Sequence, residues 1–232
     1  VITSDHNFRD TLERVRMGLE AGHSPELAVD GSGGVYFMKD ECGLHNVAVF
    51  KPMDEEPMCI NNPKGYNKNT NSSSAFMWVE EGLKKGTKIG EGAIKEVAAY
   101  ILDQWSPLMK QCGKDEEGLG FSGVPPTIMA RCYHEVFNYG FQTNADSVRI
   151  RTPKVGSLQK FIEATGNCED MSPSLFSMHE VHKITVLDLR LANTDRHGGN
   201  ILVSRRKDGK LKLVPIDHGY CLPDKVISLS LS

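Results

Sequence analysis

The sequence lacks any hydrophobic run that approaches the roughly 20 residues of a membrane-spanning helix. It also lacks a long basic run, and its net charge of −3 on 232 residues argues against a general nucleic-acid-binding protein. No signal peptide leads the chain. From these absences we expect a cytoplasmic protein without a nucleic-acid partner, in contact with membranes only as a peripheral protein if at all.

Cysteine patterns typical of metal sites and disulfide frameworks are missing as well. The six cysteines are scattered, with no C-x-x-C pair among them: Cys42, Cys59, Cys112, Cys132, Cys168 and Cys221. Reduced, mostly buried thiols are therefore expected. The composition that remains, 39% hydrophobic and 25% charged, is that of an ordinary globular chain with a core large enough for two lobes.

Two short segments carry the residues that phosphoryl transfer requires, D-R-H-G-G-N at 195–200 and I-D-H-G at 216–219. That reaction needs a carboxylate near the acceptor hydroxyl, and an Asn and a second Asp that hold the metal on the phosphates. Asp195 and Asn200 have the D-x-x-x-x-N spacing of a kinase catalytic loop, and Asp217 lies where a D-F-G aspartate would. Either segment alone could be a surface turn. Together they predict a kinase-type site with Asp195 as the base-like residue.

The predicted metal ligands are Asn200 and Asp217, whose hard oxygen atoms suit Mg²⁺, with Mn²⁺ as the alternative ion. Lys51 ends a V-A-V-F-K stretch that resembles the strand whose lysine contacts the α- and β-phosphates, although a solvated lysine is the alternative. Such a lysine needs an anionic partner, for which Glu96 is the candidate, with Glu91 behind it. His197 has two open roles, in proton transfer or in a structural hydrogen bond that orders the loop.

Hydrophobic periodicity and turn residues predict both helices and strands. Helices are expected at 8–19, 90–105 and from 178 toward the 195–200 loop, the last one behind a Ser177–Glu180 capping box. Strands are expected at 35–38, 46–51, from 124, 147–151, 201–203 and 211–216, with a loop at 61–74 and a connection at 154–164. The segment Gly31-Ser32-Gly33-Gly34 allows backbone N–H groups to approach phosphates, although such segments are more often flexible turns.

These residues resemble the catalytic domain of the phosphatidylinositol 3-/4-kinase family, and within it the plant gamma-type (type II-like) phosphatidylinositol 4-kinases. The matching segments run in the family's order through residues 31–37, 49–52, 55–57, 96–103, 155–161, 193–200 and 216–219. The resemblance implies an α+β, two-lobed protein-kinase-like fold. A linker helix (1–29) would precede an N-lobe with an antiparallel sheet and a helix (30–160) and an incomplete, mainly helical C-lobe (161–232).

The resemblance also implies substrates and further site residues. ATP with Mg²⁺ would be the phosphoryl donor, and the 4-hydroxyl of phosphatidylinositol the acceptor. Lys51 would bind the ATP phosphates and pair with Glu96. The hinge beside the adenine would comprise Gln159, Lys160, Phe161 and Ile162.

Two other functions stay open. The catalytic loop does not distinguish a lipid hydroxyl from a protein hydroxyl, so a Ser/Thr protein kinase of the same fold is one alternative. A truncated nucleotide-binding module with little catalysis is the other, because family members continue well past D-H-G whereas this chain ends at Ser232. For that reason we expect this chain to be far less active than its full-length parent.

Membrane contact is expected to be weak. Animal type II enzymes carry a palmitoylated cysteine cluster ahead of the helix that would bear Glu96. Residues 78–91 contain no cysteine here, so any membrane association would be weaker or indirect.

Overall fold

The computed structural model describes residues 6–66, 81–104, 118–140, 152–206 and 208–224. Its helices are α1 (His6–Glu20), α2 (Gly92–Gln104) and α4 (Met178–Leu191). Its strands are β1 (Glu26–Leu27), β2 (Tyr36–Lys39), β3 (Asn46–Pro52), β4 (Thr127–Cys132), β5 (Lys154–Lys160), β6 (Gly166–Asn167), β7 (Ile201–Arg205) and β8 (Leu211–Pro215). Helices and antiparallel strands together make an α+β fold, as expected. The strand expected at 147–151 and most of the loop expected at 61–74 lie outside the described residues.

The strands form two antiparallel sheets, one with the order β1-β2-β3-β5-β4 and one with the order β6-β7-β8. The stretch at 154–160, expected to be part of a connection, is instead strand β5, which lies between β3 and β4. Close backbone approach explains the glycine there, because a Cβ on Gly156 would lie 2.2 Å from the carbonyl oxygen of Lys51. Strands β2, β3, β4, β7 and β8 and the three helices fall within a few residues of where the sequence predicted them, whereas the two-residue strands β1 and β6 were not predicted.

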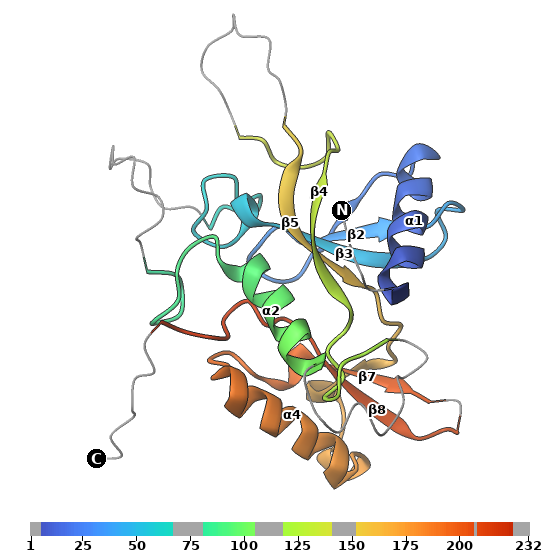
Figure 1. The fold of residues 1–232 in the computed structure, drawn as a ribbon, viewed down its shortest axis with the longest axis vertical. Coiled ribbons are helices and arrows are strands. Elements are labelled where there is room, and N and C mark those ends of the chain that lie inside the picture. The colour runs from blue at the N-terminus through green and yellow to red at the C-terminus, as the bar shows by residue number, and fades with distance from the viewer. Residues whose placement is uncertain (1–5, 67–80, 105–117, 141–151, 207, 225–232) are drawn as a thin grey trace, which may run out of the picture.

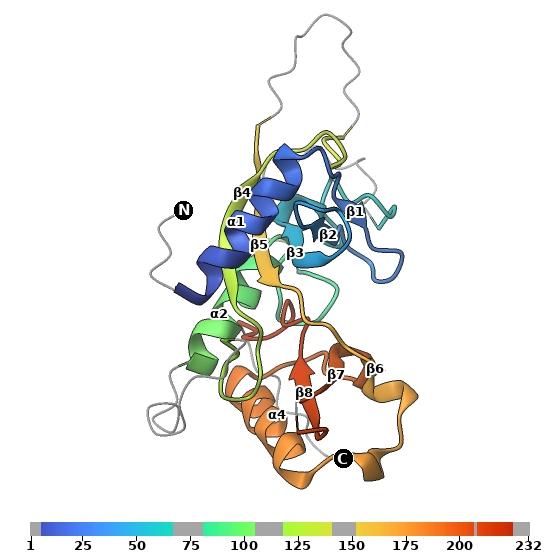
Figure 2. The same ribbon diagram turned by 90° about the vertical axis from the view of Figure 1, so that its right-hand side faces the viewer.

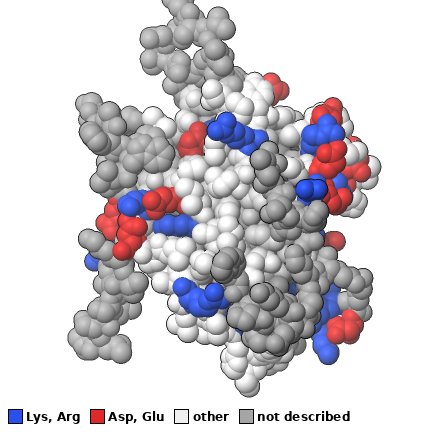
Figure 3. Space-filling view, viewed as in Figure 1, with Lys and Arg blue, Asp and Glu red and all other residues white. Residues whose placement is uncertain are grey.

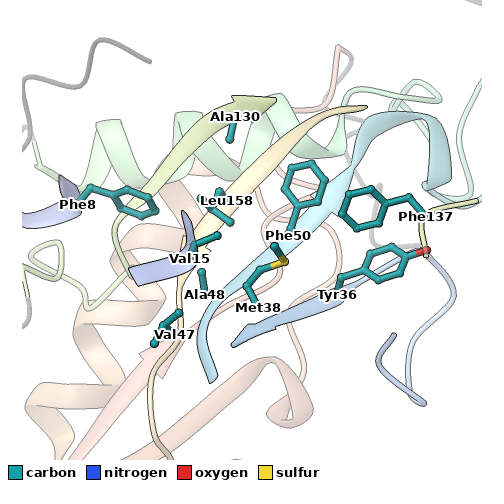
Figure 4. Close-up of a cluster of buried hydrophobic side chains, with 10 residues drawn as sticks. All are labelled: Phe8, Val15, Tyr36, Met38, Val47, Ala48, Phe50, Ala130, Phe137 and Leu158. Carbon is teal, nitrogen blue, oxygen red and sulfur yellow. The ribbon is translucent and has the colours of Figure 1, made fainter. Parts of the chain in front are cut away.

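Helix α1 covers one face of the five-stranded sheet (Figures 1 and 2). Its stripe of Phe8, Leu12, Val15 and Leu19 packs on the sheet, and Phe8 is fully buried. The apolar side of α1 is therefore part of this core. Figure 4 shows Phe8 and Val15 reaching toward the strands that carry the rest of the cluster.

Three aromatic rings fill the other end of this cluster (Figure 4). The ring of Phe137 meets Tyr36 edge-on at a centroid distance of 4.8 Å and Phe50 at 5.4 Å. Such pairs add to the free energy of simple burial because the ring edges and faces carry opposite partial charges. Phe137 thus joins the segment after β4 to β2 and β3.

Helix α2 lies on the opposite side of the sheet from α1, facing α4 and the three-stranded sheet (Figure 1). Buried side chains from α2, the segment before β4, α4 and the segment after β8 form one cluster: Ala99, Tyr100, Val124, Leu187, Leu191 and Cys221. This cluster joins the two sheets through their helices. In the described residues, no helix is both long and apolar enough to cross a membrane.

The start and the end of α4 position the loop that follows it. Ser177 Oγ accepts the Glu180 backbone N–H at 3.3 Å, the first half of the expected capping box. The Glu180 carboxylate accepts from the backbone N–H of Leu213 on β8 instead of reaching back to the cap. The helix ends at Ala192, which adopts a left-handed conformation (φ 45°) and turns the chain into residues 193–200.

We expect Phe137→Ala to reduce the free energy of unfolding by about 3–5 kcal/mol, because it removes a buried ring that two other rings contact. Urea denaturation followed by circular dichroism measures the change. Tyr133→Ala is the matched control, since Tyr133 lies on the same segment but is half exposed, and its loss should cost less than about 1 kcal/mol. Equal losses for the two variants would contradict the assigned packing.

Candidate active site

A buried ion pair links the five-stranded sheet to α2 and to the end of β8. The Lys51 ammonium on β3 contacts Glu96 Oε1 on α2 and lies 3.2 Å from Asp217 Oδ1, just after β8. Along a strand successive side chains point to opposite faces, so Lys51 faces α2 while Phe50 faces α1. The pairing expected between Lys51 and Glu96 is present in the structure. Glu91 instead lies near lysines of its own neighbourhood, 3.5 Å from Lys95 Nζ.

Lys51 and Glu96 both stay charged although burial disfavours the charged form of each. Burial alone would raise the pKa of Glu96, but the Lys51 ammonium and His218 outweigh it and hold that pKa well below its usual range. Burial alone would lower the pKa of Lys51, but Asp217 and Glu96 raise it above its usual range. Lys51 therefore stays protonated and Glu96 ionised at neutral pH, and the ammonium is available to anionic phosphates.

His218 was not predicted as a site residue. It is fully buried, and its Nδ1 lies 3.5 Å from the second carboxylate oxygen of Glu96. The position directly after Asp217 in the D-H-G motif was the available signal. The ring thus lies beside the oxygen of the Glu96 carboxylate that does not contact Lys51.

The turn after β3 fixes the start of α2, a contact that sequence reasoning also missed. Glu56 accepts the backbone N–H groups of Gly92 at 2.9 Å and Ala93 at 2.7 Å. A carboxylate at this end satisfies free N–H groups and complements the helix dipole. Burial raises the pKa of Glu56 to about 7, although the two N–H groups oppose that shift. Its neighbour Glu55 is fully buried and accepts from the Tyr36 hydroxyl at 2.6 Å.

Hydrogen bonds within the predicted catalytic loop hold Asp195 and Asn200 together. The Asn200 side-chain amide donates to the backbone carbonyl of Asp195 at 3.2 Å. Asn193 Oδ1 accepts the Asp195 backbone N–H at 3.0 Å. The structure therefore brings the two predicted residues of the D-x-x-x-x-N motif to one turn.

Arg196 ties this loop to the strand that leads to Asp217. Its guanidinium donates to the carbonyls of Asn200 and Ile216, both at 2.7 Å, and pairs with Asp188 at 3.0 Å. An arginine can bridge three acceptors because its planar donors point in fixed directions. Arg196 thus sets the position of the loop relative to Asp217, a role for which the D-R-H sequence was the available signal.

The His197 side chain contacts a neighbouring carboxylate although it is partly exposed to solvent. Its Nδ1 lies 3.0 Å from Glu169 Oε1, and more than half of each side chain is exposed. This contact favours the structural hydrogen bond, because it joins the loop to the turn at Cys168–Asp170. Participation of His197 in proton transfer stays a prediction.

The glycine segment packs on the turn after β3. A Cβ on Gly34 would lie 2.4 Å from Glu55 Oε2, and one on Gly33 would lie 3.3 Å from the ring of Pro57. Asn62 Nδ2 donates to the Ser32 carbonyl, and Gly31 has a φ of +82°. Close packing accounts for the glycines at 33 and 34, so contact of residues 31–34 with phosphates stays a prediction.

The predicted hinge residues run from the end of β5 toward the second sheet. Gln159 donates to the Thr127 hydroxyl at 3.0 Å, and the Lys160 backbone N–H donates to Pro126. The Phe161 ring packs edge-on against another aromatic ring, and Ile162 is buried between the sheets beside Val214. Residues 159–162 therefore connect the two sheets, as a hinge would, and their contact with adenine stays a prediction.

Comparison with known proteins decides the family. Residues 31–231 match the family model described as phosphatidylinositol 3- and 4-kinase. The chain belongs to this family. It is 51% identical over 218 residues to phosphatidylinositol 4-kinase gamma 4 of Arabidopsis thaliana, covering 93% of the chain and 35% of that protein. It is 53% identical to phosphatidylinositol 4-kinase gamma 3 of the same species, covering 94% of the chain and 36% of that protein.

A rice relative, phosphatidylinositol 4-kinase gamma 4 of Oryza sativa subsp. japonica, is 53% identical over 208 residues, 90% of the chain and 32% of that protein. The chain thus spans about a third of the length of these curated relatives. The match to the family model begins at the glycine segment 31–34 and includes the D-H-G motif at 217–219. Kinases of this family use ATP.

The donor groups present fit the Mg²⁺ that a kinase of this family would use. Asp217 has a half-exposed carboxylate and a left-handed backbone (φ 56°). The Asn200 amide nitrogen is engaged by Asp195, which leaves its amide oxygen as the group for a cation. One carboxylate and one amide oxygen match an ion that takes its other ligands from phosphates and water.

We expect the stability of this kinase domain to depend on the protonation of Glu56 between about pH 4.3 and about pH 7. The folded-state pKa of about 7 lies above the roughly 4.3 of an unfolded chain. The folded state therefore binds the proton more tightly, and this stabilisation is complete below about pH 4.3 and lost as the pH rises through about 7. In Glu56→Gln, which cannot ionise, the loss should disappear.

Unfolding free energies at several pH values would test this, with Glu41→Gln on an exposed turn as the control. As the pH rises, the free energy of unfolding of Glu56→Gln should increase relative to that of wild type. The free energy of unfolding of Glu41→Gln should change with pH as that of wild type does. Parallel curves for Glu56→Gln and wild type would show that Glu56 has an ordinary pKa.

Proposed function

We propose that this chain is the ATP-binding catalytic part of a phosphatidylinositol 4-kinase, which transfers the γ-phosphate of ATP to the 4-hydroxyl of phosphatidylinositol. One observation carries the proposal: the Lys51 ammonium is held between Glu96 and Asp217, with the loop of Asp195 and Asn200 tied beside it. The printed names of the relatives, phosphatidylinositol 4-kinases gamma 3 and gamma 4, support the choice of acceptor.

The proposed architecture has two lobes with the nucleotide between them. Strands β2 to β5 with α2 form the proposed N-lobe, α1 and β1 belong to the linker segment ahead of it, and α4 with the three-stranded sheet belongs to the C-lobe (Figure 2). Boundaries at 1–29, 30–160 and 161–232 remain our proposal, with the adenine beside Gln159–Ile162. We further propose a cytoplasmic location with peripheral membrane contact. Figure 3 shows charges of both signs intermixed on one face.

Each site residue has a proposed role in the transfer. Lys51 binds the α- and β-phosphates, and the backbone of residues 31–34 lies over them. Asn200 and Asp217 would hold Mg²⁺, which when bound neutralises charge on the phosphates. Asp195 orients the acceptor hydroxyl and takes its proton as the oxygen attacks the γ-phosphorus.

Labelled ATP supplied in parallel with phosphatidylinositol vesicles and a protein substrate tests the acceptor. We expect the intact protein to label the lipid, and Asp195→Ala to abolish the labelling because the base is gone. Label in protein alone would instead support the Ser/Thr protein kinase alternative. Label in neither acceptor, with nucleotide still bound, would support the nucleotide-binding module.

We expect Asp217→Asn to lower kcat by about 100-fold or more, because it removes a charge placed for the phosphates. The substitution should cost less than about 1 kcal/mol of stability, because the Asp217 carboxylate is half exposed and Lys51 keeps Glu96. Asparagine also tolerates the left-handed backbone at this position. Steady-state kinetics at several Mg²⁺ concentrations, with thermal unfolding, measures both effects, and wild-type kcat in this variant would refute the assignment.

A further inference from the structure

A short turn ahead of α2, residues 81–88, brings a lysine to the predicted catalytic base. We call this segment the 81–88 turn. Lys84 Nζ lies 2.6 Å from Asp195 Oδ1, while 43% of the Lys84 side chain and 24% of the Asp195 side chain stay exposed. Both side chains can therefore be reached by a substrate. Sequence reasoning assigned no role to Lys84, because the two residues lie in segments far apart in the chain.

Hydrogen bonds inside the 81–88 turn converge on the residue that carries this ammonium. The Lys84 carbonyl accepts both the backbone N–H of Thr87 at 3.1 Å and its hydroxyl at 2.6 Å. Gly82 donates to the Thr87 carbonyl at 2.7 Å, and Glu81 accepts from the Gly86 backbone at 3.0 Å. These hydrogen bonds within the turn fix the backbone that carries the Lys84 side chain.

The turn is also attached to the segment that follows Asp217. Lys88 Nζ lies 2.5 Å from Asp224 Oδ2, and the Asp224 backbone N–H donates to the Gly86 carbonyl at 2.8 Å. At its other end the turn continues into α2, which carries Glu96. Two sides of the site therefore fix the position from which Lys84 reaches Asp195.

The chemistry of phosphoryl transfer gives this ammonium a second partner. A base lies about 2.6–3.2 Å from the acceptor oxygen, which in turn lies about 3–3.5 Å from the phosphorus it attacks. The ammonium of a lysine that contacts the base can therefore reach the transferring phosphoryl group by rotation of its own side chain. Lys51, between Glu96 and Asp217, is assigned to the α- and β-phosphates, and His197 contacts Glu169.

We propose that Lys84 is a catalytic cation supplied from outside the catalytic loop, which holds Asp195 before substrates bind and contacts the transferring phosphoryl group during the reaction. As the acceptor oxygen bonds to the γ-phosphorus, the bond from that phosphorus to the ADP oxygen breaks and ADP leaves with the electron pair. Asp195 receives the acceptor proton. Lys84 stays protonated and neutralises charge on the phosphoryl oxygens. The proposal rests on phosphoryl transfer at this site but not on a lipid acceptor.

Kinetics of Lys84→Met in the intact protein provides the first test. We expect kcat to fall about 100-fold with phosphatidylinositol and with water as acceptor, since the lost contact is to the phosphoryl group common to both reactions. Lys84→Arg, which keeps the charge, should stay within about 10-fold of wild type. Lys85→Met is the matched control, because it removes the same charge from the exposed neighbouring residue, and it should retain wild-type kcat.

Binding of ADP with Mg²⁺ and aluminium fluoride, a mimic of the transferring phosphoryl group, gives a readout that needs no acceptor. Wild type should bind this combination more tightly than ADP alone, as measured by calorimetry. Lys84→Met should lose about 100-fold of that advantage while its Kd for ADP stays unchanged. Thermal unfolding checks that each variant is folded.

The outcomes separate this proposal from the proposed function. If wild type hydrolyses ATP but labels no phosphatidylinositol, the lipid kinase proposal fails and the Lys84 comparison can still be made with water. Undiminished kcat and undiminished aluminium fluoride binding in Lys84→Met would overturn the proposal. Higher activity in Lys84→Met would also overturn it, because the lysine would then be an inhibitory contact. No gain from aluminium fluoride in wild type counts against it equally.

Discussion

One ammonium group, that of Lys51, holds the parts of this domain in a common geometry. It lies where β3, α2 and the end of β8 meet, and its carboxylate partners are 45 and 166 residues away in the chain. A lysine that is four-fifths buried is stable only with anionic partners at short range. Because Glu96 and Asp217 meet that need in the structure, the same ammonium is charged and positioned for phosphates.

The surrounding contacts keep these three groups in place. Glu56 fixes the first turn of α2 and so the direction of the helix that carries Glu96. Arg196 connects the loop after α4 to the carbonyl just before Asp217. The 81–88 turn then links the start of α2 to the segment after Asp217. Each link joins segments that a nucleotide would contact from different sides, so the site is built from tethers between elements.

Local patterns predicted much of the fold. The apolar stripe from Phe8 to Leu19 identified α1, because burial of one face imposes the period of a helix, and the apolar run after a polar turn identified β3. The pattern failed at β5, where four successive residues, 156–159, are buried, so both sides of the strand are covered there and the sequence carries no simple alternation. The Lys51–Glu96 pair was predicted because a phosphate-binding lysine needs an anionic partner, whereas the contacts of Lys84, Glu56 and His218 were not predicted.

The sequence by itself determined the motifs, the order of the elements and the family to which they point, because these depend on neighbouring residues in the chain. Only the tertiary structure decided which charges meet. The contact of Lys84 with Asp195 and that of Glu56 with the start of α2 join segments that no local periodicity relates. Electrostatic and hydrogen-bond energies depend on distances of a few ångströms, and packing of the sheets and helices sets those distances.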